Sequence, residues 1–467
     1  MDYALKQGAS YADVRVQFEE STGLVISEGV LEEGGTASLA GIGVRVVAKG
    51  AWGFCSTDDA ISRIRARETV DRAIRLASGS AEGTKYPVKM APAKPIRARV
   101  SSDKDAMVSD EEYTIDAVLE PAKECERRAM SAGKEVLAFS LSFSTGRSVE
   151  TFASSDGSLI TQANRGYLGT LYVVASSQGI AEYYPYDFGG LGSYEDFLNR
   201  SLPQLSGKIA EKACQISKSR SLTKTATFKT VIMDPNFVAL WVHETIGHPL
   251  EADRVLGGRG DPQNGPWTSA AFGTRVAADS FNVLDNPSIE TPAWLKYDSE
   301  GVESKNKRLI NKGVIQSCIH NRETAEAFQV EPNGGARSPS YRFTPMPRMS
   351  NTYVESGNWS TQEIIEDTRD GIFVVGGMTP TVDSRAMEWK ISAKEAYIIT
   401  KGEMTEVLRD IVVSEVTPDF LISIDAIGKD PRITVTPDCS KGSPLQTLPV
   451  GNGGPAIRGK AYLKGVA

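Results

Sequence analysis

The stretch DPNFVALWVHETIGHPLEAD, residues 234–253, contains two of the three histidines in this chain of 467 residues. Asp234 is a favourable N-cap residue, and Pro235 would occupy the first helical position, where its missing N–H costs nothing. The apolar residues that follow can anchor a helix in a protein core. The stretch therefore predicts a core helix that begins at Pro235 and carries His243 and His248 about two turns from its start.

The spacing of these two histidines is unusual for a metal site on a helix. They flank a glutamate in the pattern H-E-x-x-x-H, one residue longer than the H-E-x-x-H of zinc proteases. At ~100° per residue, Glu244 and His248 share a helix face, whereas His243 and His248 point about 140° apart. Gly247 and Pro249 favour a local departure from α-helical hydrogen bonding. We therefore predict a π-bulge or an unwound turn between Glu244 and Pro249, which would aim both imidazoles at one ion.

The two histidines need a partner, because a catalytic zinc ion usually has three protein ligands and one position left for water. The residues alone offer Glu251, Asp253, His320 and Cys439. Cys439 is favoured over His320, since a thiolate is a strong zinc ligand and this cysteine lies in a glycine- and proline-rich stretch. Glu251 and Asp253 more readily orient the histidines through hydrogen bonds. The alternative to a metal site is a chance cluster on an ordinary core helix, because the motif is short.

Composition disfavours several classes of protein. The net charge is −7 and no long basic run is present, which argues against direct binding of nucleic acid. The N-terminal sequence MDYALKQGAS does not have the pattern of a secretory signal, and no apolar run approaches the ~18 residues of a membrane span. Five cysteines without a C-x-x-C pair indicate free thiols rather than a disulfide framework. We therefore expect a cytoplasmic protein that neither spans a membrane nor contacts nucleic acid directly.

The order of predicted elements indicates an α+β protein. An N-terminal and a central region each combine helices with strands in mixed sheets, whereas the C-terminal region is strand-rich apart from the helix at Pro235. The proline-rich stretch KYPVKMAPAKP, residues 85–95, separates the first two regions. The alternating stretch VLAFSLSFS, residues 136–144, predicts a strand with Leu137, Phe139, Leu141 and Phe143 on one face. The predicted domains are an N-terminal α/β domain, a central α/β domain and a C-terminal domain with the metal site, at residues 1–95, 100–221 and 223–467.

Four segments taken together resemble the TldD/PmbA (TldD/TldE) family. They are GIGVRVVAKGAWGFCST (41–57), HETIGHPLEAD (243–253), PMPRMSNTY (345–353) and CSKGSPLQTLPVGNGGPAIR (439–458). Because these segments span nearly the whole chain, the resemblance covers more than the short histidine motif. It implies a TldD-type subunit, the kind that carries H-E-x-x-x-H, whereas TldE/PmbA-type subunits lack the motif.

The resemblance implies a role for each residue of the motif. His243, His248 and Cys439 would bind one Zn²⁺ per active subunit, and Glu244 would be the general base. The implied activity is that of a zinc metallopeptidase that cleaves peptides and unfolded segments, including the removal of leaders from modified peptides. This chain departs from the family pattern at Pro249, where glycine is frequent, and at Ser440, where glycine is also frequent. These departures bear on substrate preference more than on chemistry.

The resemblance also implies partners and two other functions. The chain would form a homodimer, or a heterodimer with a TldE/PmbA-type subunit. A non-catalytic scaffold or regulatory subunit is one alternative, but a scaffold has no need of Glu244. An indirect effect on DNA gyrase, through cleavage of a peptide directed at that enzyme, is the other. The net charge of −7 disfavours a direct contact with DNA.

Glycine-rich segments are the candidates for binding an extended peptide. Peptidases of extended substrates commonly pair with the peptide backbone by strand addition at an exposed sheet edge. Gly376 and Gly377 in IFVVGGM, residues 372–378, and the loop 439–454 would permit a close approach of two backbones. The alternative is that these glycines only form turns.

Overall fold

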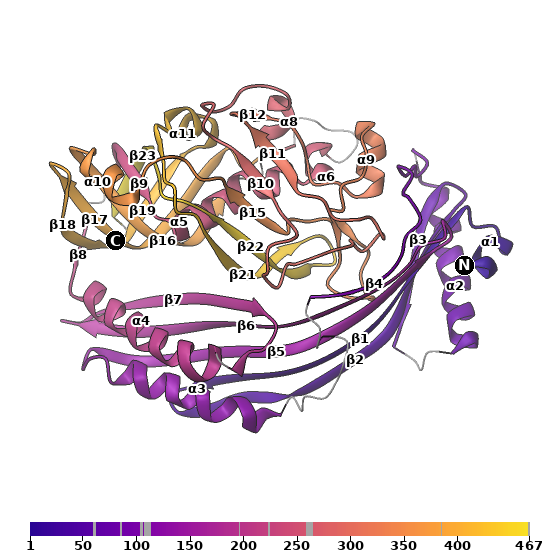
Figure 1. Cartoon of the computed structure of the whole chain (residues 1–467), viewed down its shortest axis with the longest axis horizontal. Helices are drawn as coiled ribbons and strands as arrows, with labels where there is room; N and C mark the ends of the chain where they lie inside the picture. Colours follow the sequence, from indigo (N-terminus) through magenta and orange to yellow (C-terminus); the bar gives the residue numbers. More distant parts are fainter. Residues whose placement is uncertain are drawn as a thin grey trace.

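The computed structural model describes residues 1–58, 62–84, 86–102, 106, 114–195, 197–222, 225–257, 265–383 and 385–465. A long, curved sheet forms one layer, and the C-terminal residues lie on its concave side (Figure 1). Helices and strands in mixed sheets confirm the predicted α+β class. Within the described part of the chain, no helix is both long and apolar enough to cross a membrane.

The curved sheet is formed by strands from both the N-terminal and the central regions. Among the described residues it has seven strands in the order β3-β2-β1-β5-β6-β4, with β7 paired to β6. β1 pairs with β5, so the predicted boundary at residues 95–100 falls between strands of one sheet, and the division into two domains stays a prediction. The strands are β1 Tyr11–Ser27, β2 Val30–Ala48, β3 Ala51–Thr57, β4 Arg97–Ser101, β5 Val136–Ser154, β6 Leu159–Ser177 and β7 Ile180–Leu191.

Helices cover the convex face and one end of this sheet (Figure 1). The N-terminal end carries α1 (Asp2–Lys6) and α2 (Arg63–Ala81), whose residues Ala73 and Ala77 pack in a small core with β2. The convex face carries α3 (Ile115–Met130) and α4 (Leu202–Ser217), which follows a π turn, η1 (Phe197–Ser201). Their apolar faces bury side chains of β1, β5 and β6 in a second core.

The predicted placement of Leu137 on the same face as Phe139 is wrong. Phe139 is buried as part of the core, but the side chain of Leu137 is 58% exposed. The pairing of β5 with β6 shifts between Val136 and Ala138, so that a β-bulge turns Val136 inward and Leu137 outward. A bulge interrupts the period-two alternation on which the prediction depended.

The C-terminal region contains a closed sheet and an open sheet. In the closed sheet, strands pair in the order β16-β9-β23-β19-β17, and β17 pairs again with β16. β18, β8 and β20 extend it. Its strands are β8 Arg220–Ser221, β9 Thr227–Met233, β16 Asp370–Val382, β17 Glu388–Thr400, β18 Glu403–Arg409, β19 Ile411–Val416, β20 Ala426–Ile427 and β23 Ile457–Gly465.

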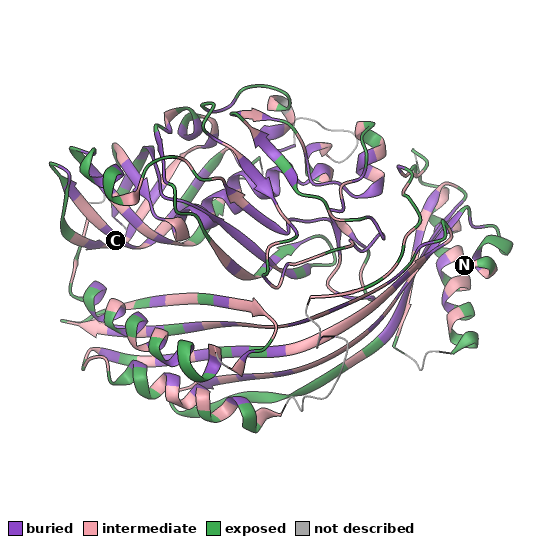
Figure 2. Ribbon diagram, viewed as in Figure 1, coloured by how far each residue is buried: buried purple, intermediate pink, exposed green. Residues whose placement is uncertain are grey.

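The open sheet has the strand order β12-β11-β10-β15-β22-β21 among the described residues. Its strands are β10 Val283–Asp285, β11 Lys307–Asn311, β12 Val314–Ile315, β15 Asn351–Val354, β21 Arg432–Lys441 and β22 Gln446–Gly454, and β13 Ala336–Arg337 pairs separately with β14 Met346–Pro347. Helix α5 (Pro235–Val242) contacts strands of both sheets, and burial is dense around it (Figure 2). The remaining helices are α6 Ala252–Val255, α8 Trp267–Ala271, α9 Arg322–Phe328, α10 Thr361–Glu366 and α11 Thr417–Ser423.

Candidate metal centre

Helix α5 begins as the sequence predicts. The Asp234 carboxylate accepts a hydrogen bond from the backbone N–H of Phe237 at 2.7 Å, and Pro235 is the first helical residue. The same carboxylate accepts the N–H of Gly376 in β16 at 2.8 Å, which ties the start of the helix to the closed sheet. Phe237 and Trp241 are fully buried. The helix is therefore fixed by its cap and by its core contacts before the histidines are reached.

The predicted departure from α-helical geometry is confirmed. Residues His243–Gly247 form a π turn, η2, and His248–Leu250 form a short 3₁₀ turn, η3. The π turn inserts the extra residue that the longer motif requires. As a result the rings of His243 and His248 lie with their centroids 4.6 Å apart, and the ring planes are nearly perpendicular.

Gly247 serves this turn through its small size rather than through an unusual backbone conformation. Its φ of −61° is ordinary for a helix. A Cβ atom at this position would lie 2.0 Å from the Sδ atom of Met349, which is fully buried. The glycine therefore lets the turn pack against β15 and the segment before it.

Cys439 completes a group of three possible metal ligands. It lies in β21, and its Sγ atom is 3.4 Å from Nε2 of His248. One ligand atom each from His243, His248 and Cys439 lies within 4.8 Å of the others, and all three residues are buried. Two imidazoles and a thiolate match the soft, nitrogen- and sulfur-rich donor sets of transition-metal sites. The structure thus brings together the three residues that the sequence and the resemblance single out.

Mutual electrostatic effects keep the sulfur of this group anionic. Burial by itself raises the pKa of the Cys439 thiol, but the neighbouring His243 and His248 outweigh it and lower the pKa to about 4. Burial lowers the pKa of His248, but the carboxylate of Glu251 and the Cys439 thiolate outweigh it and raise the pKa to about 10. A thiolate is the form of cysteine that binds metal.

Glu251 orients His248. Its carboxylate is fully buried and lies 3.1 Å from Nδ1 of His248, which leaves Nε2 facing the sulfur of Cys439. Lys441 Nζ lies 3.1 Å and Arg254 Nε 3.2 Å from the same oxygen. Burial favours the protonated acid, but Lys441 and His248 outweigh it and hold the pKa of Glu251 well below its usual range. The carboxylate therefore stays charged beside the histidine, as partners of metal-bound imidazoles commonly do.

Asn452 orients His243, and the sequence did not identify it. Its Oδ1 atom lies 2.8 Å from Nδ1 of His243, and its Nδ2 donates to Oγ1 of Thr436 at 2.8 Å. The amide thus bridges the imidazole and the Thr436 hydroxyl. The only sequence signal was the glycine-rich GNGG at 451–454. A side chain at Gly451 would clash with Asn351, whose Oδ1 lies 2.0 Å from where the Cβ atom would be.

The three ligands lie at the wall of a cavity of about 800 Å³ that Glu244 also lines. Its other walls come from the end of β16, from residues 436–440 of β21 and from Asp187 of β7. Glu244 is half-buried, and no described residue donates a hydrogen bond to its carboxylate. The arrangement can therefore hold a metal ion beside the Glu244 carboxylate, at a cavity large enough for a ligand.

The other sequence candidates lie outside the ligand group. Asp253 accepts a hydrogen bond from Lys441 Nζ at 2.7 Å and thus supports Glu251 from the far side. His320 is buried against Phe328, and burial lowers its pKa to about 4. Residues 372–374 are not the exposed edge that was expected, because β16 pairs with β9 and β17 there. The N–H of Gly376 is bound to Asp234, and Gly377 packs beside Leu240; a role for either in substrate binding stays a prediction.

Comparisons with known proteins agree with this geometry. Models of the PmbA/TldA metallopeptidases match residues 12–80 (domain 1), 109–220 (central domain) and 226–461 (C-terminal domain). A metalloprotease of Methanocaldococcus jannaschii is 32% identical over 97% of both chains. A zinc metalloprotease TldD homolog of Saccharolobus solfataricus is 28% identical over 67% of both chains.

Solved structures share the fold at low sequence identity. TldE from Thermococcus kodakarensis has a TM-score of 0.77 at 14% identity and covers 99% of this chain and 98% of its own. A Thermotoga maritima protein, named as a proposed modulator of a DNA gyrase, has a TM-score of 0.77 at 17% identity and covers 99% and 97%. At these identities the similarity shows the fold alone.

Proposed function

Because the chain belongs to the family of PmbA/TldA metallopeptidases, we propose that it is a zinc-dependent peptidase that cleaves peptides and unfolded segments. Its relatives are metalloproteases, so hydrolysis of peptide bonds is the activity of the family. The single observation that carries the proposal is the meeting of His243, His248 and Cys439 at a cavity that also contains Glu244.

The donor set fits zinc. Catalytic zinc sites commonly use three nitrogen, sulfur or oxygen ligands and keep a fourth position open. His243, His248 and Cys439 would hold the ion, each through the atom that faces the other two. When bound, zinc lowers the pKa of a coordinated water towards ~7 and polarises a substrate carbonyl.

Glu244 is the general base in this proposal. It follows His243 directly, lines the same cavity and, unlike Glu251, is not engaged with buried cations. Its carboxylate would accept the proton of the attacking water and then return it to the leaving amine. A reaction with Cys439 as the nucleophile is less favoured. Its sulfur lies in one group with the two imidazoles and would be bound to the same metal ion as they are.

The peptide would bind in an extended form along β21. Among the described residues this strand has β22 as its one partner, and Thr436 to Ser440 line the metal cavity. An unpaired strand edge can add a peptide strand through backbone hydrogen bonds, which suits substrates of varied sequence. Maturation and degradation of peptides are both compatible with such binding.

A dimer is part of the proposal, either of two copies or with a TldE/PmbA-type subunit. The shared fold with TldE supports it. The rival functions are a regulatory subunit without activity and an indirect modulator of DNA gyrase, the second favoured by the name of the Thermotoga maritima protein. An intact ligand group beside Glu244 favours the peptidase over a regulatory subunit, which would need neither.

The test is cleavage of an unstructured peptide of mixed sequence, followed by mass spectrometry. We expect cleavage by the purified chain, loss after chelation and recovery after addition of stoichiometric zinc. The same assay with an added TldE-type subunit separates the homodimer from the heterodimer. Cleavage that survives complete removal of metal would contradict a metallopeptidase, and no cleavage in any of these states would favour the regulatory subunit.

A further inference from the structure

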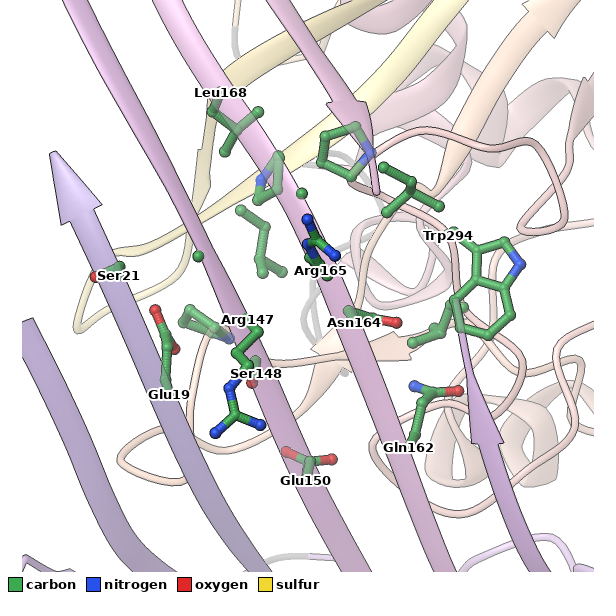
Figure 3. Close-up of a pocket in the computed structure, with 18 of the residues that line it drawn as sticks. Glu19, Ser21, Arg147, Ser148, Glu150, Gln162, Asn164, Arg165, Leu168 and Trp294 are labelled. Carbon is green, nitrogen blue, oxygen red and sulfur yellow. The ribbon is translucent and has the colours of Figure 1, made fainter. Parts of the chain in front are cut away.

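A second cavity lies between the concave face of the curved sheet and the C-terminal region (Figure 3). Its volume is about 300 Å³. Leu448 and Pro449 of β22 line one wall, and Leu448 is the cross-strand partner of Cys439. None of the residues His243, Glu244, His248 and Cys439 lines this cavity, and nothing in the proposed chemistry uses it.

The floor of this cavity is polar. In the strand register Glu19 of β1 lies opposite Ser148 of β5, which lies opposite Asn164 of β6. Glu150 and its partners in the neighbouring row share the same face, because side chains alternate along a strand. Figure 3 shows these side chains on adjacent strands, with Trp294 on the side of the C-terminal residues.

Acceptor atoms on this floor lack donors. Within the described structure, Glu150 accepts no hydrogen bond, and its nearest cation, Arg15, is 3.8 Å away. Glu19 accepts one hydrogen bond, from Nε2 of Gln17 at 3.2 Å. The Oδ1 atom of Asn164 is buried and has no hydrogen-bond partner among the described residues. Burial raises the pKa of both carboxyls, as expected where a carboxylate is poorly solvated and poorly paired.

Two arginines near the floor, Arg15 and Arg337, are engaged by backbone carbonyls. Arg15 donates to the backbone carbonyls of Ser340 and Phe343, and Arg337 donates to those of Met349 and Pro449. These contacts hold the cations against the wall rather than offering them to a ligand. The acceptors of Glu19, Glu150 and Asn164 are the groups left on the floor for a cationic ligand; Arg165 also lines the cavity.

Arg147 is also not available. It is bound to Glu20, with 2.8 Å between Nη2 and the carboxylate, and its guanidinium lies over the ring of Phe18. Arg147 lines the cavity as well, but its guanidinium is held by the Glu20 carboxylate.

We propose that this cavity binds a basic side chain of the peptide substrate, with its cationic group above Ser148. Glu19, Glu150 and Asn164 would accept its N–H groups, and Trp294 would contact its aliphatic stem and cationic end. Arginine fits best, because its five donors match several acceptors held around one point. The inference rests on the proposed function. It gives that peptidase a preference for peptides with a basic residue away from the bond that is cut.

The test is a binding measurement that does not depend on cleavage. Two labelled Gly-Ser decapeptides carry either one central arginine or citrulline, which has the same shape without the charge. Fluorescence anisotropy follows their binding to the full-length Glu244→Gln variant. We expect the arginine peptide to bind about tenfold more tightly or better, as for hydrogen bonds to charged groups.

Matched variants show whether the preference for arginine comes from this cavity or from a general attraction between the peptide and the acidic protein. Glu150→Gln and Glu19→Gln, each added to Glu244→Gln, should reduce the preference to less than about threefold. Glu33→Gln, at an exposed position of β2, should leave it unchanged. Melting temperatures report whether each variant folds, and the two floor variants act as independent checks.

Equal binding of the two peptides, or binding of neither, would overturn the proposal. So would a preference that persists in both floor variants. Cleavage of the citrulline peptide by the wild-type chain tests the proposed peptidase separately, so that its failure and the failure of this inference give different results.

Discussion

The imidazole rings of His243 and His248 lie 4.6 Å apart, although their positions in the chain would place them about 140° apart on a regular helix. The π turn His243–Gly247 removes this angle. The turn depends on glycine at position 247, because Met349 leaves no room there for a side chain. The geometry of the metal centre is therefore linked to packing behind the helix, where no ligand lies.

Gly247→Ala tests this link. The added methyl group would have to displace the buried Met349 sulfur, so we expect destabilisation of about 1–3 kcal/mol and a weaker affinity for metal. Thermal melting and zinc titration measure the two effects. Gly79→Ala is the matched control, because it lies in helix α2 with open space around it. Met349→Ala combined with Gly247→Ala should restore part of the metal affinity; no restoration would show that the space is not the cause.

Glu244→Gln should keep the fold and the metal but lose peptide hydrolysis by about 10²–10⁴-fold, since only the proton acceptor is removed. Turnover of an unstructured peptide and the zinc content of the same preparation are the measurements. Glu33→Gln is a control for the loss of one negative charge. Turnover equal to that of the wild type would assign the base to another group.

Glu251→Gln should lower metal affinity by about 10–100-fold, because the amide no longer holds the ring of His248 through a charged contact. It also removes one of the two carboxylates at Lys441 and leaves only Asp253, so we expect a loss of about 1–3 kcal/mol in the free energy of unfolding. Zinc titration and denaturant unfolding check these values. Asp253→Asn is the comparison: it removes the outer partner of Lys441, which is partly exposed, and should have the smaller effect.

Asn452→Ala should also weaken metal binding by about 10–100-fold, by freeing the ring of His243. Asn452→Asp keeps an acceptor at the same place and should retain most of the affinity. The absorption spectrum of the cobalt-substituted protein reports the ligand geometry directly. If Asn452→Ala gives the spectrum and affinity of the wild type, the hydrogen bond does not position the imidazole.

Local chemistry was the predictable part of this site. The cap at Asp234 and the irregular turn before Pro249 follow from residue types a few positions apart, and both are present. Cys439 lies 191 residues from His248, so its choice over His320 depended on thiolate chemistry and on the family resemblance. Sequence reasoning had no means to find Asn452, because its contact with His243 depends on the register of β22 beside α5.

The fold was predictable as a class but not as a topology. Alternating and helical patterns gave the α+β class and the strand-rich C-terminal region. They did not show that β1 and β5 join two regions in one sheet, since strand pairing across more than 100 residues leaves no local signal. Nor did they show the bulge that turns Leu137 outward or the closure of β16 onto β17, both of which depend on partner strands.

The most direct test of the central claim is the metal content of the purified chain, measured by elemental analysis for the wild type and for single alanine variants of the three histidines and Cys439. We predict about one zinc ion per chain in the wild type and in His320→Ala, whose histidine is buried elsewhere. We predict a loss of most of the zinc in His243→Ala, His248→Ala and Cys439→Ala, with circular dichroism confirming that each is folded. Undiminished zinc in these three variants, or a loss only in His320→Ala, would contradict the account.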